Sequence, residues 1–301
     1  MDIEIARGSG FCPGVRRAVR LALQAAERQG RRIVTLGPLV HNPLVVEMLE
    51  TRGIRAVDAF DGDADVVIVR AHGIPDPQRD ALRRRRVEIV DATCPLVRRS
   101  QKYAKALRDD GYQVVILGDA EHAEVRAVAS CAGDRAVVVE SPEALLPGEL
   151  GPRLGILAQT TQPQDAFLRL VQRAVPMAEE VRVVNTICRS TAARLAEAER
   201  LARRVQVMIV VGGRTSHNTQ ELARACLRAG VETHHVERAE ELQDAWFRNI
   251  RRVGVAAGAS TPDGAIGDVA DRIRGLEPPA GRHQAAPGPR AGAGATPFPP
   301  D

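Results

Sequence analysis

The N-terminal stretch DIEIARGSGFCPGVRRA (Asp2–Ala18) sets the design of this chain: a β-branched run, one cysteine, then a helical pattern. The same layout returns at VEIVDATCPLVRRS (Val87–Ser100) and at VRVVNTICRS (Val181–Ser190). An apolar strand ending in glycine follows each helical pattern, and a histidine comes soon after. These histidines stand 29, 28 and 29 residues after Cys12, Cys94 and Cys188. Such a repeat predicts three similar units that present equivalent edges to one point.

Short apolar runs alternate with amphipathic helical stretches, which is typical of parallel α/β architecture. We therefore predict three similar parallel-sheet α/β domains in a pseudo-threefold arrangement, at residues 13–93, 94–187 and 188–276. The expected strands are Ile33–Leu36, Ile54–Val57, Val66–Val69 and Glu88–Asp91 in the first, Val114–Leu117, Ala136–Val139, Leu154–Leu157 and Val181–Val184 in the second, and Val207–Val211, Glu232–Val236 and Val253–Ala256 in the third.

The third unit is one strand short, and the missing strand is available at the other end of the chain. Asp2–Ile5 precedes Cys12 much as Val87–Val90 precedes Cys94. We predict that residues 1–12 complete the sheet of the third unit and so tie the chain into a ring. Residues 277–301 are rich in Pro, Gly and Ala without periodicity, and are expected to form a disordered tail.

Composition excludes several classes of function. The net charge is only +4 and aromatic residues make up 3% of the chain, which argues against a nucleic-acid partner. No apolar run approaches the ~20 residues that a membrane span needs, and the N-terminus lacks the features of a signal peptide. We expect a soluble, cytoplasmic protein. Five cysteines in such a chain favour metal or redox use over a disulfide framework.

The three repeated cysteines occupy strand-to-helix turns, where a helix N-terminus is expected to lower the pKa of a thiol. Three convergent thiolates suit an iron–sulfur cluster in which one iron lacks a protein ligand. A zinc site with three cysteines and one histidine is the competing arrangement. Cys131 and Cys226 lie within helical patterns, where small apolar packing is the favoured interpretation.

Polar side chains follow the carboxyl ends of the expected strands, where parallel sheets bind ligands. Donors of this kind, several of them at helix N-termini, suit a phosphate or diphosphate. The candidates are His41, His72, His122, Ser216, His217, Asn218 and Ser260. Glu121 and Glu124 are the glutamates of the three glycine-then-histidine loops, and either could relay protons; their spacing hardly separates them.

At this level of detail the chain resembles the 4-hydroxy-3-methylbut-2-enyl diphosphate reductases, the LytB family. The motifs that carry the resemblance run in order from Gly10 to Asp263, and are GFCPGVRRA, LGPLVHNP, AHG, VDATCPLV, AEHAEV, AQTT, NTIC, SHNT and VGVAAGASTPD. The resemblance implies three α/β domains around a [4Fe–4S] cluster held by Cys12, Cys94 and Cys188, with one open iron that takes the allylic hydroxyl of the substrate. The products would be isopentenyl and dimethylallyl diphosphate, in the methylerythritol phosphate route to isoprenoids.

The resemblance also assigns roles. His41, His72, Ser216, Asn218 and Ser260 would hold the diphosphate, with His122 beside them and with His217 as a further contact. Glu124 would donate protons and Thr160 would complete the hydrogen-bond network of the substrate hydroxyl. A ferredoxin- or flavodoxin-like protein would supply electrons, because the chain has no flavin or nicotinamide fingerprint. We expect a monomer or weak dimer.

Some positions depart from the family pattern. His217 stands where the family often has a small residue or a second serine, Arg194–Leu195 replaces an Arg-Gln pair, and Asp119 replaces a frequent histidine. These changes leave room for altered substrate preference. Two rival functions therefore stay open at this point: a redox or iron sensor that uses the same cluster without turnover, and a binding module stabilised by zinc.

Overall fold

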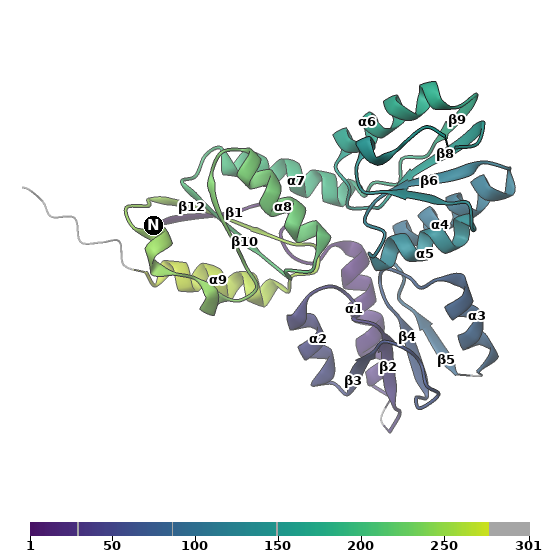
Figure 1. Cartoon of the computed structure of the whole chain (residues 1–301). Helices are drawn as coiled ribbons and strands as arrows, with labels where there is room; N and C mark the ends of the chain where they lie inside the picture. Colours follow the sequence, from purple (N-terminus) through teal and green to yellow (C-terminus); the bar gives the residue numbers. More distant parts are fainter. Residues whose placement is uncertain (29, 86, 149, 277–301) are drawn as a thin grey trace, which may run out of the picture.

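The computed structural model describes residues 1–28, 30–85, 87–148 and 150–276, and in these residues three lobes meet at a common centre (Figure 1). The expected tail at 277–301 lies outside the described residues. Each lobe contains one four-stranded sheet, and every strand pairing within the three sheets is parallel. The prediction of three similar parallel α/β units is confirmed.

The first lobe is built from the elements α1 (Pro13–Ala26), β2 (Ile33–Leu36), α2 (Pro43–Glu50), β3 (Ile54–Val57), β4 (Val66–Val69), α3 (Asp76–Arg84) and β5 (Glu88–Asp91). Its sheet has the order β3-β2-β4-β5. Helices α1 and α2 pack on one face of the sheet, and α3 packs on the other. Proline opens both α1 and α2, which is favourable because its ring fixes a helical φ and the first turn needs no N–H donor.

The second lobe repeats this arrangement with α4 (Pro95–Asp109), β6 (Gln113–Leu117), α5 (Ala123–Ala132), β7 (Val137–Val139), β8 (Arg153–Ala158), α6 (Gln164–Ala174) and β9 (Glu180–Val183). The sheet order is β7-β6-β8-β9. Helices α4 and α5 cover one face and α6 covers the other. The predicted bounds were slightly wrong here: Ala136 closes a turn onto Gly133, and Val184 continues to pair with Ile156 just beyond the strand.

The third lobe contains α7 (Arg189–Ala202), β10 (Val207–Val211), α8 (His217–Arg228), β11 (Glu232–Val236), β12 (Arg252–Ala257) and α9 (Asp263–Arg274). Its sheet has the order β1-β12-β10-β11, in which β1 (Asp2–Ile5) comes from the start of the chain. Ile3 is opposite Val253 in a parallel register, so the predicted pairing of the N-terminal strand is confirmed. Helices α7 and α8 cover one face and α9 the other.

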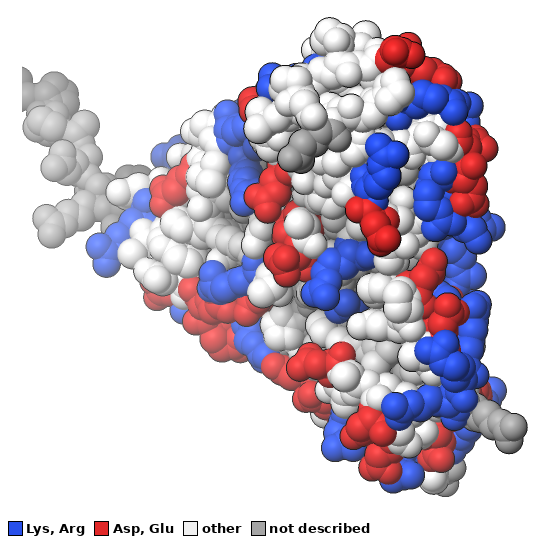
Figure 2. Space-filling view, turned by 45° about the vertical axis from the view of Figure 1, so that its right-hand side comes forward, with Lys and Arg blue, Asp and Glu red and all other residues white. Residues whose placement is uncertain are grey.

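The cores are aliphatic, as the shortage of aromatic residues requires. The central strands β4, β10 and β12 are lined by valine, isoleucine and alanine that are nearly inaccessible to water. Each such valine or isoleucine contributes about 1.5–3 kcal/mol by burial. The outer surface is mixed in charge: basic and acidic side chains are interspersed on the face shown in Figure 2. None of the helices in the described part of the chain is both long and apolar enough to cross a membrane.

Candidate active site

Each repeated cysteine stands at a junction between two lobes. Cys12 follows β1 of the third sheet and caps α1 of the first lobe. Cys94 likewise links β5 to α4, and Cys188 links β9 to α7. Because every cysteine leaves an edge strand of one sheet and starts a helix of the next lobe, the three thiols come together where the lobes meet. All three line one central cavity.

Gly14 shows how closely two of the sulfur atoms approach. A Cβ atom added to Gly14 would lie 2.7 Å from Sγ of Cys94 and 3.8 Å from Sγ of Cys12. Any side chain at position 14 would therefore displace the sulfur of Cys94. The backbone N–H of Val15 also donates to Sγ of Cys12 at 3.4 Å. The three cysteines are free thiols and are partly accessible from the cavity.

The expected lowering of the thiol pKa is not found at Cys94. We expected the helix N-terminus to lower the pKa of these cysteines, whereas the pKa of Cys94 is raised. Burial of the thiol raises it most, and the backbone N–H groups of Leu96 and Val97 only partly offset that effect. A bound metal ion would remove this cost, because coordination deprotonates a thiol outright. The other two cysteines of the chain lie elsewhere: Cys131 and Cys226 are buried in the packed cores of the second and third lobes.

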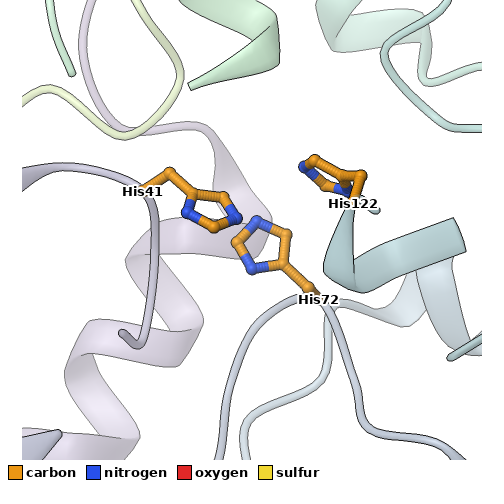
Figure 3. Close-up of side chains that lie close together, drawn as sticks. All are labelled: His41, His72 and His122. Atoms are coloured by element: carbon orange, nitrogen blue, oxygen red, sulfur yellow. The ribbon is translucent and has the colours of Figure 1, made fainter. Parts of the chain in front are cut away.

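Three histidines, one from each of three loops, also line the cavity. His41 precedes α2, His72 follows β4, and His122 caps α5; their rings point toward one another (Figure 3). The ring centroids of His41 and His72 are 4.4 Å apart, and that of His122 lies 5.3 and 5.2 Å from them. The ring of His217, the first residue of α8, is 6.3 Å from His122 and accepts or donates a hydrogen bond at 2.9 Å with Thr161.

The histidines are neutral at physiological pH, which decides what they can bind. Burial lowers the pKa of His41, His72, His122 and His217, and in the case of His122 the value falls to about 3. Nδ1 of His122 accepts the backbone N–H of Glu124 at 3.1 Å, so the proton of this neutral ring lies on Nε2. His122 thus presents an N–H donor to the cavity.

The three histidine rings lie close enough together to be considered as a metal site. One ring nitrogen from each of His41, His72 and His122 lies within 4.8 Å of the other two, which a cation could use. A metal ion needs a lone pair from every ring, and His122 has already committed its Nδ1 lone pair to its own helix. An N–H donor at a helix N-terminus, such as His122, is better matched to an anion.

Several buried polar atoms around the same cavity lack partners within the part of the chain that the structure describes. They are Nε2 of His41, Nδ1 of His72, Nδ2 of Asn218 and Oγ of Ser260. Buried polar groups in proteins are nearly always hydrogen-bonded, and each one left unpaired costs about 1–3 kcal/mol. Their convergence on one cavity indicates a polar ligand. Ser216, at the N-terminus of α8, also lines this cavity.

Glu124 and Thr160 form a buried pair that lines the same cavity. The backbone N–H and the hydroxyl of Thr160 donate to the two carboxylate oxygens of Glu124 at 2.7 and 2.8 Å. Burial raises the pKa of Glu124 to about 6, although the two bonds from Thr160 act to lower it. Glu121, which spacing alone hardly distinguished from Glu124, is exposed and is not part of the cavity lining.

Apart from Glu121, the cavity brings together the side chains for which the sequence predicted a role in the site: Cys12, Cys94, Cys188, His41, His72, His122, Glu124, Thr160, Ser216, His217, Asn218 and Ser260. Sequence reasoning missed Thr161, Thr191 and Gly14 as parts of the site. The sequence assigned no role to Arg194 beyond its place next to Leu195, which differs from the family pattern. Yet this arginine of α7 is 5% exposed and donates to the carbonyl oxygens of Ala257 and Gly10 at 2.8 and 3.0 Å, which fixes the Cys12 loop.

Comparison with known proteins agrees with this geometry. The model of the LytB protein family matches residues 3–274, which is nearly all of the described chain. The chain belongs to the LytB family. A LytB-family relative from Geobacter sulfurreducens, a 4-hydroxy-3-methylbut-2-enyl diphosphate reductase, is 44% identical over 91% of this chain and 97% of its own length.

Two solved reductase structures are also similar to this chain. The structure of an (E)-4-hydroxy-3-methyl-but-2-enyl diphosphate reductase, described as the terminal enzyme of the non-mevalonate pathway, is 39% identical and covers 91% of this chain and 99% of its own, with a TM-score of 0.68. A second reductase structure, from Plasmodium falciparum, has a TM-score of 0.85, covers 92% of this chain and 89% of its own, and is 24% identical. The latter shows a shared fold.

Proposed function

We propose that this LytB-family chain reductively dehydroxylates (E)-4-hydroxy-3-methylbut-2-enyl diphosphate to isopentenyl and dimethylallyl diphosphate. One observation carries the proposal: three free thiols and a set of buried polar atoms without partners in the described residues line a single cavity. The relatives support it, because they are named as reductases of this diphosphate. A sensor function gains no support from these names.

The donor set fits a [4Fe–4S] cluster on Cys12, Cys94 and Cys188. Three thiols at three helix N-termini can hold three irons and leave the fourth without a protein ligand. When bound, the cluster would supply electrons and a Lewis-acidic iron to the allylic carbon–oxygen bond. The overall step consumes two electrons and two protons; the carbon–oxygen bond breaks, a carbon–hydrogen bond forms and water leaves.

The diphosphate would occupy the part of the cavity that the histidines line. His122 can donate from Nε2, and Asn218 from its unpaired amide nitrogen. His41, His72 and Ser260 offer further unpaired polar atoms, and Ser216 and His217 lie at the N-terminus of α8, where the helix dipole favours an anion. Binding an anion to neutral, pre-formed donors requires little rearrangement.

Protons would come from Glu124. Its pKa of about 6 leaves roughly a tenth of the carboxyl group protonated at pH 7, far more than for an ordinary glutamate, so it can act as a general acid. Thr160 holds both carboxyl oxygens and so fixes the direction in which the proton is presented. Its hydroxyl lines the same cavity, where it can also hydrogen-bond to the hydroxyl of the substrate.

The proposed context is a cytoplasmic monomer or weak dimer that receives electrons from a ferredoxin- or flavodoxin-like protein. The test is anaerobic turnover by the reconstituted chain with (E)-4-hydroxy-3-methylbut-2-enyl diphosphate and a chemical reductant. Consumption of substrate with formation of both isoprenoid diphosphates supports the proposal. A stable cluster that leaves the substrate unchanged would instead favour the sensor and overturn the reductase.

A further inference from the structure

A basic groove runs along the surface beside the cysteine site. It is lined by Arg17 of α1 and by Thr93, Pro95, Arg98, Arg99 and Lys102 around the start of α4. Four of these six residues are basic and none is acidic. Cys94 lies between Thr93 and Pro95 in the sequence, so the groove borders the segment that carries one of the three thiols.

Helices α1 and α4 carry much more basic charge than the rest of the chain. Helices α1 and α4 together contain eight basic residues and a single acidic one, Asp109, whereas the whole chain has a net charge of only +4. The remainder of the chain is therefore net negative. Basic charge is therefore concentrated on the two helices that Cys12 and Cys94 cap, and is not spread evenly over the chain.

Two arginines of the groove are anchored and two basic residues are presented to solvent. Arg17 donates to the carbonyl oxygens of Thr93 and Asp91 at 3.2 and 3.4 Å, and Arg98 pairs with Asp91 at 2.8 Å. Arg99 and Lys102 are exposed on α4. The anchored pair shapes the groove, whereas Arg99 and Lys102 are available to a partner.

An apolar strip adjoins these charges. Leu96 and Tyr103 are each 36% exposed, and together with Arg99 they follow the i, i+3, i+7 spacing of one helix face. The guanidinium of Arg99 lies 5.3 Å from the centroid of the Tyr103 ring. Leu96 also lines the central cavity, so the strip leads from the outer surface to the thiols. An apolar centre with a charged rim is the usual composition of a transient protein interface.

We propose that the groove and this strip of α4 dock an acidic one-electron donor protein. Its negative surface would be steered by Arg99 and Lys102, and its redox centre would approach the thiol site next to Leu96. The inference rests on the proposed function, because it requires a redox group on Cys12 and Cys94. Each docking event oxidises the donor by one electron, so two reduced donor molecules are consumed for each substrate.

The test compares two electron sources in the reconstituted enzyme. Arg99→Glu combined with Lys102→Glu should raise the KM for a reduced plant-type [2Fe–2S] ferredoxin at least ~10-fold at low ionic strength, since charge at an interface governs encounter. Turnover with reduced methyl viologen should stay within about twofold of wild type. The matched control is Arg52→Glu combined with Arg55→Glu, the same charge change at exposed positions around β3, which should leave both activities unchanged.

A direct titration of ferredoxin into the cluster-loaded protein keeps this test independent of turnover. Binding that weakens in the α4 variant and persists in the β3 control supports the docking surface. Equal ferredoxin affinity in the α4 variant and wild type would overturn it, as would equal losses in both variants. Failure of wild-type protein to turn over with methyl viologen would contradict the proposed reaction, while the titration would still decide the docking proposal.

Discussion

Thr160 donates to both carboxylate oxygens of Glu124, once from its backbone N–H at 2.7 Å and once from its hydroxyl at 2.8 Å. The two residues are 36 positions apart: Glu124 lies in the first turn of α5, and Thr160 lies in the loop after β8. Glu124 itself is 2% exposed. A buried carboxyl group held in this way at a cavity wall is suited to deliver a proton in a fixed direction.

Replacing Glu124 with alanine or glutamine should lower turnover on the order of 10²-fold or more, as expected when a general acid is lost. The cluster should remain, because Glu124 is not among the proposed ligands. Turnover is followed with a chemical reductant, and iron is measured on the same samples. Near-normal turnover in the glutamine variant would assign proton delivery to another group.

The raised pKa of Glu124 predicts a pH-dependent stability in the metal-free protein. Its folded value of about 6 exceeds the ordinary value of 4.5, so the folded state binds this proton more tightly than the unfolded state does. The stabilising contribution is therefore complete below pH 4.5 and is lost as pH rises through about 6, for a total of about 2 kcal/mol.

Chemical denaturation between pH 4 and pH 8 measures this effect, with Glu124→Gln as the reference that cannot ionise. The unfolding free energy of wild type relative to the glutamine variant should fall as the pH rises through that window. A difference that stays constant with pH would show that Glu124 has an ordinary pKa in the folded protein.

Gly14 should tolerate no side chain, because a Cβ atom there would lie 2.7 Å from Sγ of Cys94. We expect Gly14→Ala to hold less than half of the wild-type iron after reconstitution. Gly267→Ala in α9 is the matched control, since a Cβ atom there meets nothing within 4 Å and alanine is the better helix former. Wild-type iron content in the Gly14 variant would show that the sulfur can move aside at little cost.

Arg194 should be important for stability although it forms no ion pair with a carboxylate of the described residues. Arg194→Met removes the donors to the carbonyl oxygens of Gly10 and Ala257, and leaving these buried acceptors unpaired should cost about 2–4 kcal/mol. Arg200→Met, on the same helix, removes an exposed arginine that pairs with Glu197, and should cost less than about 1 kcal/mol. Equal unfolding free energies for the two variants would contradict this role.

The repeated layout of the sequence predicted most of the fold. Equivalent strands before Cys94 and Cys188 made it possible to assign Asp2–Ile5 to a sheet whose other strands lie more than 200 residues away, and the register of Ile3 with Val253 agrees. Strand ends were less predictable: Ala136 was expected in a strand, but its N–H pairs with Gly133 in a turn. The sequence pattern does not show where such local hydrogen bonds end a strand. The domain boundaries at 13–93, 94–187 and 188–276 stay a prediction.

The site was predictable where a residue type carries its own chemistry, as the cysteines and histidines do. It was not predictable where function depends on distance or burial. Spacing hardly separated Glu121 from Glu124, whereas burial does so at once. The raised pKa of Cys94 likewise results from burial and opposes the effect expected from its helix N-terminus. The role of Gly14 depends on a contact with a residue 80 positions away, which no local pattern records.

The central claim is that three cysteines from three junctions hold one cluster, and iron analysis of cysteine variants tests it most directly. Wild-type protein reconstituted without oxygen should contain about four irons per chain and absorb near ~400 nm, as a [4Fe–4S] cluster requires. Alanine at Cys12, Cys94 or Cys188 should abolish both the iron binding and the absorbance. Alanine at the buried core positions Cys131 and Cys226 should leave both unchanged. A colourless wild-type protein that binds a single zinc ion, or full iron content after loss of any of the three cysteines, would contradict the claim.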